Sequence, residues 1–138
     1  MNLGRCLLAC VAIFGCVSLV RAEVPPRSVE DLQKTASHIV TGKVVKVTGT
    51  DQKGAGAGYV DVAYVIEVKV LEVKKGKGMA VGDVVLAKAW KAKERPKGWT
   101  GPSGQYEIPK EGQTVKLYLE GENGEYTAIS PNGIQKVE

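Results

Sequence analysis

The stretch YVDVAYVIEVKVLEVKK, residues 59–75, constrains the fold of this chain more than any other. Apolar residues alternate along it and would share one face of a strand, at Val60, Val62, Tyr64, Ile66, Val68 and Val70. At roughly 3.3 Å per residue, about 15 residues extend over about 50 Å, which is longer than a domain of this size can hold straight. The alternation slips by one residue at Leu71 and Val73, as it does at a β-bulge. A strand bent there can pair with different neighbours along its two halves, which predicts a sheet that closes on itself.

Segments before and after this strand supply neighbours for it. Ser28 is a predicted N-cap for a short amphipathic helix at 28–37, and a strand follows at 38–47. Further strands are predicted at 82–90, 114–120, 125–130 and, as a last short run, 134–137. The glycine-rich segment 48–58 is expected to be a mobile loop, and 91–112 a long irregular excursion. The pattern predicts an all-β protein with one short N-terminal helix.

The first 22 residues have the pattern of a signal peptide. A charged start at Arg5 precedes an apolar run at 6–20, and the small residue Ala22 precedes Glu23. The apolar run is shorter than a membrane span, which needs about 20 residues. We therefore expect cleavage after Ala22, a secreted or periplasmic protein, and no transmembrane span in the mature chain.

The three cysteines of the chain, Cys6, Cys10 and Cys16, all lie in this leader. The mature chain would then have no disulfide bond, although it enters an oxidising compartment. As an alternative, residues 13–16 loosely resemble the sequence that precedes a lipidated cysteine in bacterial lipoproteins, which would leave the protein lipid-anchored through Cys16. The bulky Phe14 stands where that motif prefers a small residue, so we favour ordinary cleavage.

The mature chain would have the size and charge of one ordinary domain. Residues 23–27, with two prolines, form a predicted linker, and residues 28–138 form the domain. Without the leader and its two arginines, the chain has 116 residues with 17 basic and 15 acidic side chains. So small an excess of positive charge predicts no strong overall attraction to nucleic acid or anionic lipid.

The sequence predicts neither a metal site nor a nucleotide cofactor. His38 is the only histidine, whereas a zinc or copper site needs several histidine or cysteine ligands, so we expect a partly buried or capping residue. No EF-hand spacing for calcium is present. The glycine run at 54–58 leads into a strand, whereas phosphate-binding loops lead into a helix.

The sequence predicts no catalytic residue either. Ser103 lacks the G-x-S-x-G context of a nucleophile elbow. Carboxylates that could serve a hydrolase acting on cell-wall sugars are present at Asp61, Glu67, Glu107 and Glu111. Such residues mostly keep strand faces solvated. We expect a protein that is not an enzyme, with carboxylate-based hydrolysis as an alternative.

The stretch from Trp90 to Tyr106 is the strongest candidate for a binding site. Basic residues alternate with spacers between two tryptophans, and such groups can stack on bases or sugars and hold phosphates or protein carboxylates. The candidate binding residues are Trp90, Lys91, Lys93, Arg95, Trp99 and Tyr106, with Lys53 and Tyr59 beside them. In the alternative interpretation, Trp90 fills the end of the barrel, Trp99 fixes the loop, and the lysines are solvated.

The order of the predicted elements resembles a known family. The helix runs into ASHIVTGKVVKV, the long strand ends VLEVKKGKG before VGDVV, and PKEGQTVKLYLEGENGEYTAISPNGIQKV completes the chain. These features are similar to the bacterial relatives of the netrin-like module, an OB-fold family that includes the tissue inhibitors of metalloproteinases. The resemblance implies a five-stranded, partly open Greek-key barrel over residues 28–138. It also implies a ligand surface of the usual OB type, with Lys53, Tyr59, Asp61, Lys69, Lys88, Gly121 and Asn123.

The inhibitory mechanism of the animal family members does not transfer to this chain. Their mature chains begin with a disulfide-bonded cysteine that reaches the protease zinc, whereas this one would begin with Glu23, Val24 and Pro25. We therefore expect a secreted, non-enzymatic binding module of OB-fold type, without a cofactor, whose partner is a protein or an envelope component. The alternative is a binder of polyanions or single-stranded nucleic acid that uses the basic aromatic loop at 90–106, although export argues against nucleic acid.

Overall fold

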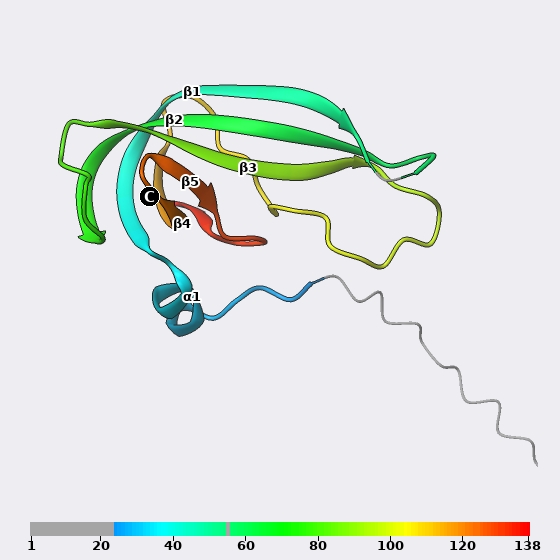
Figure 1. The fold of residues 1–138 in the computed structure, drawn as a ribbon, viewed down its shortest axis with the longest axis horizontal. Helices are drawn as coiled ribbons and strands as arrows, with labels where there is room; N and C mark the ends of the chain where they lie inside the picture. The colour runs from blue at the N-terminus through cyan, green and yellow to red at the C-terminus, as the bar shows by residue number, and fades with distance from the viewer. Residues whose placement is uncertain (1–23, 55) are drawn as a thin grey trace, which may run out of the picture.

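The computed structural model describes residues 24–54 and 56–138 and consists mainly of strands (Figure 1). One helix, α1 (Val29–Thr35), precedes six strands: β1 (His38–Lys53), β2 (Val60–Lys75), β3 (Val84–Glu94), β4 (Thr114–Glu122), β5 (Glu125–Ala128) and β6 (Ile134–Lys136). The predicted leader, with its alternative lipid anchor at Cys16, lies outside the described residues. Within the described residues, no helix is both long and apolar enough to cross a membrane.

Five of the strands form a closed barrel. The order around it is β1, β2, β3, β5, β4, and the pairing of β4 with β1 returns to the first strand. Neighbouring strands are antiparallel except β3 and β5, and β6 pairs with the first half of β4. The spatial order β4-β1-β2-β3 is that of a Greek key. The prediction of an all-β, OB-fold-like barrel is confirmed, and the barrel is closed rather than partly open.

The long strand β2 bends at the predicted place. Thr41 and Gly42 of β1 pair with residues of β2 that are two positions apart, which leaves Leu71 without a partner in β1. Val70 is fully buried, whereas Leu71 is exposed. A Cβ atom on Gly42 would lie 2.6 Å from the carbonyl oxygen of Lys69. The two strands can approach this closely at the bulge because the residue in β1 is glycine.

The first strand is longer than predicted and is the one that closes the barrel. Its residues 38–43 pair with β4 on one side, while β2 pairs along nearly its whole length on the other. Residues 48–53, expected to be a mobile loop, therefore belong to β1. Their side chains are exposed, so no apolar alternation marks them, and backbone pairing with β2 makes them a strand.

Small and β-branched side chains fill the barrel. The inward face of β3 carries Val85, Ala87 and Ala89, whereas Val84 and Leu86 on its other face are exposed. The fully buried residues of the main core are Val40, Ile66, Val68, Val70, Ala87, Val115, Leu117 and Leu119. Tight packing of these side chains fixes the strands on which the candidate site is built.

The helix α1 covers one side of the barrel, below β1 in Figure 1. Its N-cap is the predicted Ser28, whose hydroxyl oxygen accepts a hydrogen bond from the backbone N–H of Asp31. A second apolar cluster is formed by Leu32, Ala36, Ile39, Tyr118 and Ile129. Burial of a leucine side chain contributes about 1.5–3 kcal/mol, so Leu32 holds the helix on the barrel.

Beyond the barrel, β1, β2 and β3 continue as a curved three-stranded ribbon of residues 48–53, 60–65 and 88–94 (Figure 1). Residues 91–94, expected to begin the excursion, belong to β3, so the excursion starts at Arg95 at the far end of this ribbon and then turns back along β3. The N–H of Ala92 donates to the carbonyl oxygen of Ser103 (2.9 Å), and the N–H of Gln105 donates to that of Trp90 (2.8 Å). The excursion is therefore hydrogen-bonded to β3 rather than irregular throughout.

Candidate functional site

A cavity of about 470 Å³ lies between the end of β3 and the returning part of the excursion. Its walls come from Lys91, Ala92, Lys93 and Arg95, from residues 101–106, from the turn at Ser130 and Pro131, and from Val24. These segments are distant in sequence, so the fold itself assembles the cavity. Its volume lies within the range of small-ligand sites, about 300–1,000 Å³.

Three basic side chains and no acidic one line the cavity: Lys91, Lys93 and Arg95. The ammonium group of Lys91 donates a hydrogen bond to the carbonyl oxygen of Tyr106 at 2.7 Å. Among the described residues, no acidic side chain lies within ion-pair distance of it. Lys91 therefore brings an uncompensated positive charge to the cavity.

Lys93 is directed toward β1 by an irregularity in its own strand. A register shift in β3 leaves Lys93 without a partner in β2, as at a bulge. Its ammonium nitrogen lies 2.6 Å from a carboxylate oxygen of Asp51. The hydrogen bond that Lys93 donates to Asp51, and then the negative charge of Asp51, raise the pKa of Lys93 above the ordinary value of 10.5. Because both side chains are about half exposed, the pair contributes little to stability.

Arg95 is largely buried, with a side chain only 14% exposed. Its guanidinium group forms an ion pair with Asp61 and donates to the carbonyl oxygen of Val60 at 3.3 Å. The ring centroids of Tyr59 and Trp99 each lie 5.6 Å from the guanidinium carbon. These cation–π contacts connect the excursion to the loop between β1 and β2.

The remaining predicted residues divide between the cavity and its surroundings. Tyr106 lines the cavity, and its hydroxyl group donates to the carbonyl oxygen of Val24. Trp90 is half-buried and is not among the lining residues, and Lys53 is exposed at the end of β1. The structure therefore brings Lys91, Lys93, Arg95 and Tyr106 together and leaves Trp90 and Lys53 outside the cavity.

A buried glutamine that the sequence did not single out forms part of the wall. Gln105 is only 2% exposed, and its side-chain nitrogen donates to the carbonyl oxygens of Ala128 (3.2 Å) and Ile129 (3.0 Å). Its Oε1 atom is buried and accepts no hydrogen bond within the described structure. Glutamine is usually an exposed residue, so nothing in the sequence distinguishes this one.

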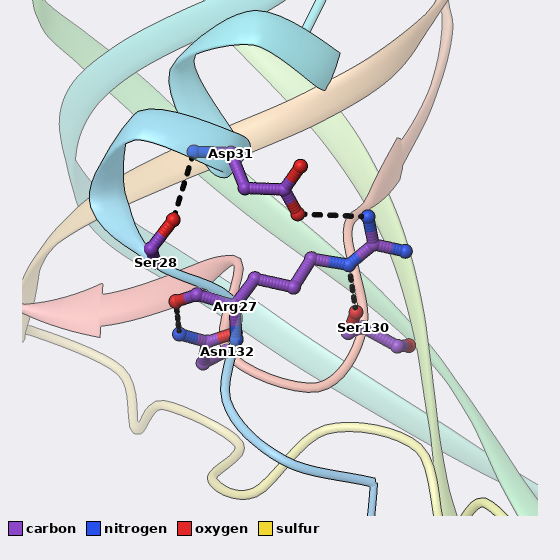
Figure 2. A network of polar contacts seen from close by, with 5 residues as sticks. All are labelled: Arg27, Ser28, Asp31, Ser130 and Asn132. Carbon is purple, nitrogen blue, oxygen red and sulfur yellow. Dashed lines mark hydrogen bonds and ion pairs between the residues drawn. The ribbon is translucent and has the colours of Figure 1, made fainter.

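A hydrogen-bond network at Arg27 fixes the wall that contains Val24 (Figure 2). The backbone N–H of Arg27 donates to Asn132 Oδ1 (3.0 Å), and Asn132 Nδ2 donates back to the carbonyl oxygen of Arg27 (2.9 Å). The guanidinium group donates to the carbonyl oxygen of Ser130 (3.1 Å) and to Asp31 (3.3 Å). Residues 24–27, here called the strap, are thus held against the C-terminal turn that also lines the cavity.

His38 is part of the barrel wall. Its ring is buried and packs edge-on against Tyr126, with ring centroids 4.7 Å apart. Nε2 lies 2.7 Å from the carbonyl oxygen of Lys77, which accepts its hydrogen bond, and Nδ1 lies 2.9 Å from Oγ of Ser37. No cluster of three or more possible metal-binding side chains occurs in residues 24–54 and 56–138.

The ligand surface implied by the family resemblance is largely separate from the cavity. Lys69 and Lys88 are exposed on β2 and β3, while Gly121 and Asn123 belong to the hairpin between β4 and β5. None of these four residues lines the cavity. Gly121 and Asn123 have φ values of 133° and 56°, so the turn conformation accounts for them.

Comparisons with known proteins give no match: no family model, no curated protein and no solved structure matches this chain. They therefore neither support nor contradict the resemblance to the netrin-like module. The functional interpretation depends on the cavity and on the residues that line it.

Proposed function

We propose that this chain is a secreted or periplasmic, non-enzymatic binding module that binds a protein partner at the cavity and the adjoining excursion. The assembly of the cavity is the observation that carries the proposal, because separate segments converge there and hydrogen bonds hold them in place. A site that is already ordered loses less conformational entropy on binding than mobile loops do. Its basic lining suits a partner that brings an acidic group.

The ion pairs beside the cavity favour a protein partner over a polyanion. A polyanion is held mainly by several free cations, whose contacts with phosphates release counterions. Two of the three lining cations, Lys93 and Arg95, are already paired with Asp51 and Asp61. The aromatic rings at the tip of the ribbon pack around Arg95 rather than standing free to stack on bases.

The carboxylates considered for hydrolysis are not gathered in this cavity. Asp61 is paired with Arg95, and Glu107 lies 3.5 Å from Lys136. No residue that lines the cavity is acidic, whereas glycoside hydrolysis needs two carboxyl groups that face the substrate. These positions support a binding function rather than a hydrolytic one.

Kinship with the netrin-like module is a further part of this proposal. It is supported by the helix that precedes β1 and by the OB-fold-like strand order. The predicted mature N-terminus, Glu23 and Val24, has no cysteine to reach a protease zinc, so we do not extend the proposal to that mechanism.

Affinity capture with matched variants tests the proposed function. The mature chain and its variants Lys91→Gln and Lys97→Gln are immobilised and exposed to envelope proteins of the source cell. Glutamine at position 91 removes the charge but keeps a donor for Tyr106, whereas Lys97 is exposed and does not line the cavity. We expect a partner that the wild type and Lys97→Gln retain and Lys91→Gln loses. Equal recovery of every protein by all three chains would contradict the proposal.

Binding to heparin or to a single-stranded oligonucleotide distinguishes the polyanion alternative from the proposed protein partner. Retention at low salt that falls steeply as salt rises would favour that alternative. We expect little retention, because two of the lining cations are already neutralised.

A further inference from the structure

Two buried polar atoms without hydrogen-bond partners in the described structure lie on residues that line the cavity. One is Nε of Arg95, a donor, and the other is Oε1 of Gln105, an acceptor. Most buried polar groups in proteins are paired, so two such atoms at one site need an explanation. Neither atom is accessible in the structure, so a ligand that offers one acceptor and one donor would complement both only after these two side chains turn toward the cavity.

The charges around the cavity restrict which ligand chemistry fits. Arg95 is already paired with Asp61, so the uncompensated charge is that of Lys91, and it favours an acceptor that is negatively charged, such as a carboxylate. The neutral Oε1 of Gln105 accepts from an uncharged N–H or O–H group. Ionised phosphodiesters offer acceptors alone, whereas an acidic peptide carries carboxylates and backbone N–H donors side by side.

We infer that the cavity binds an extended acidic peptide segment. The carboxylate of an aspartate or glutamate side chain lies against Lys91 and Arg95, and a nearby backbone N–H of the peptide donates to Gln105. Lys91 can make this contact because an ammonium group has three donors and Tyr106 uses one of them. The inference rests on the proposed function, since it names the part of the protein partner that enters the cavity.

The walls of the cavity suit the backbone of such a segment. Ala92, Ser103 and Gly104 have small side chains or none, and they leave room for a peptide main chain. The strap and the returning excursion are both hydrogen-bonded to other parts of the protein, so these walls exist before the peptide arrives. Binding to walls that are already ordered needs little rearrangement of the protein.

Titration of the ¹⁵N-labelled mature chain with short blocked peptides tests this inference. The probes are Ac-Ala-Asp-Ala-NH2, the asparagine peptide of the same shape, and sodium acetate, which has a carboxylate but no amide N–H. We expect the aspartyl peptide to cause saturable shifts at the amides of Ala92, Ser103 and Tyr106 and at the side-chain amide of Gln105. It should bind at least about fivefold more tightly than the other two probes, because a charged hydrogen bond and a neutral one are both made.

Variants of the lining residues sharpen the titration. Lys91→Gln should lower the affinity for the aspartyl peptide at least about fivefold, to a value close to the affinity for the asparagine peptide. The control Lys97→Gln should keep the wild-type affinity. Gln105→Met removes the acceptor but also two hydrogen bonds of the folded chain, so it is compared only if its amide spectrum stays native, and Lys91→Gln carries the test otherwise.

Four outcomes would overturn the inference: no saturable shift with the aspartyl peptide, equal affinities for the two peptides, shifts confined to residues outside the cavity, or acetate binding as tightly as the aspartyl peptide. If capture still yields a partner that Lys91→Gln loses, the proposed function stands and the peptide chemistry fails. If the aspartyl peptide binds but capture yields no partner, the chemistry of the cavity stands and the proposed function fails.

Discussion

Lys93 on β3 and Asp51 on β1 form an ion pair of 2.6 Å that crosses the intervening strand β2. Asp51 lies directly opposite Val62 of β2, so the pair spans the face of the ribbon that carries this valine. Strands two positions apart in a sheet are separated by about 10 Å. A contact over that distance needs a long side chain such as that of lysine, and the ribbon that the pair crosses is curved (Figure 1).

The raised pKa of Lys93 predicts that this ion pair loses its effect in alkali. A lysine whose pKa is higher in the folded than in the unfolded state stabilises the fold fully below the ordinary value of 10.5, and this contribution disappears as the pH rises through the folded-state pKa. We expect wild type to melt slightly above Lys93→Met near neutral pH and the difference to vanish well above 10.5. Thermal melts across this pH range check it. The matched variant Lys97→Met should show no such trend. A melting-temperature difference between wild type and Lys93→Met that grows with pH would refute a stabilising ion pair at Lys93.

Substitution of Gly42 should destabilise the barrel at the bulge of β2. A Cβ atom there would meet the carbonyl oxygen of Lys69, which belongs to the backbone and cannot move aside alone. We expect Gly42→Ala to lower the free energy of unfolding by about 1–3 kcal/mol. Gly49→Ala in the same strand is the control, because its new Cβ would meet side-chain atoms of Tyr64 and Val62 and no backbone atom. Equal losses in urea titrations of the two variants would contradict the close approach at Gly42.

Removal of the Asn132 side chain should release the strap. Both hydrogen bonds between this side chain and the backbone of Arg27 would be lost, so Asn132→Ala should destabilise the protein by about 1–3 kcal/mol. Hydrogen exchange gives a local measurement. Protection of the Arg27 amide should fall more than that of the Val44 amide, which is hydrogen-bonded to Gln113 within the barrel. Unchanged exchange at Arg27 would show that the strap is held by other contacts.

Truncation of the buried Leu32 should destabilise the protein through lost packing of α1, which truncation of an exposed residue of the same helix does not affect. Leu32 is fully buried, whereas Val29 on the same helix is 53% exposed. We expect Leu32→Ala to lower the free energy of unfolding by about 2–5 kcal/mol and Val29→Ala to change it by less than about 0.5 kcal/mol. Chemical denaturation of both variants measures the difference. Similar values for the two would mean that the helix is not docked through Leu32.

The fold could be predicted from the sequence wherever a strand buries one face. The phase of β2 and its slip at Leu71 follow from apolar side chains at every second position, and so do the buried residues Val115, Leu117 and Leu119 of β4. Residues 48–53 of β1 bury no face, so their sequence has no alternation. Their strand conformation depends on pairing with β2, which depends on contacts far along the chain.

The sequence pattern indicated the basic residues of the cavity but not the acidic residues that pair with two of them. The alternation of basic residues after Trp90 drew attention to Lys91, Lys93 and Arg95, and all three line the cavity. The acidic partners of Lys93 and Arg95, Asp51 and Asp61, lie on β1 and β2, where nothing in the local sequence relates them to these cations. The wall at Val24 depends on a contact between Arg27 and Asn132, which are 105 positions apart. Such long-range contacts follow from the topology and have no signature in a short window of residues.

From Val45 to Lys53, the side of β1 away from β2 has no strand beside it in the described structure. An open border of this kind offers backbone N–H and C=O groups that another extended polypeptide could use as a template for fibril growth. Lys46, Gly49 and Lys53 stand along this border, and lysine is the residue that natural sheets most often place there to prevent such growth. Acetylation of these lysines, which removes their charge, would therefore be expected to shorten the time in which concentrated solutions of the protein stay free of amyloid-like aggregates.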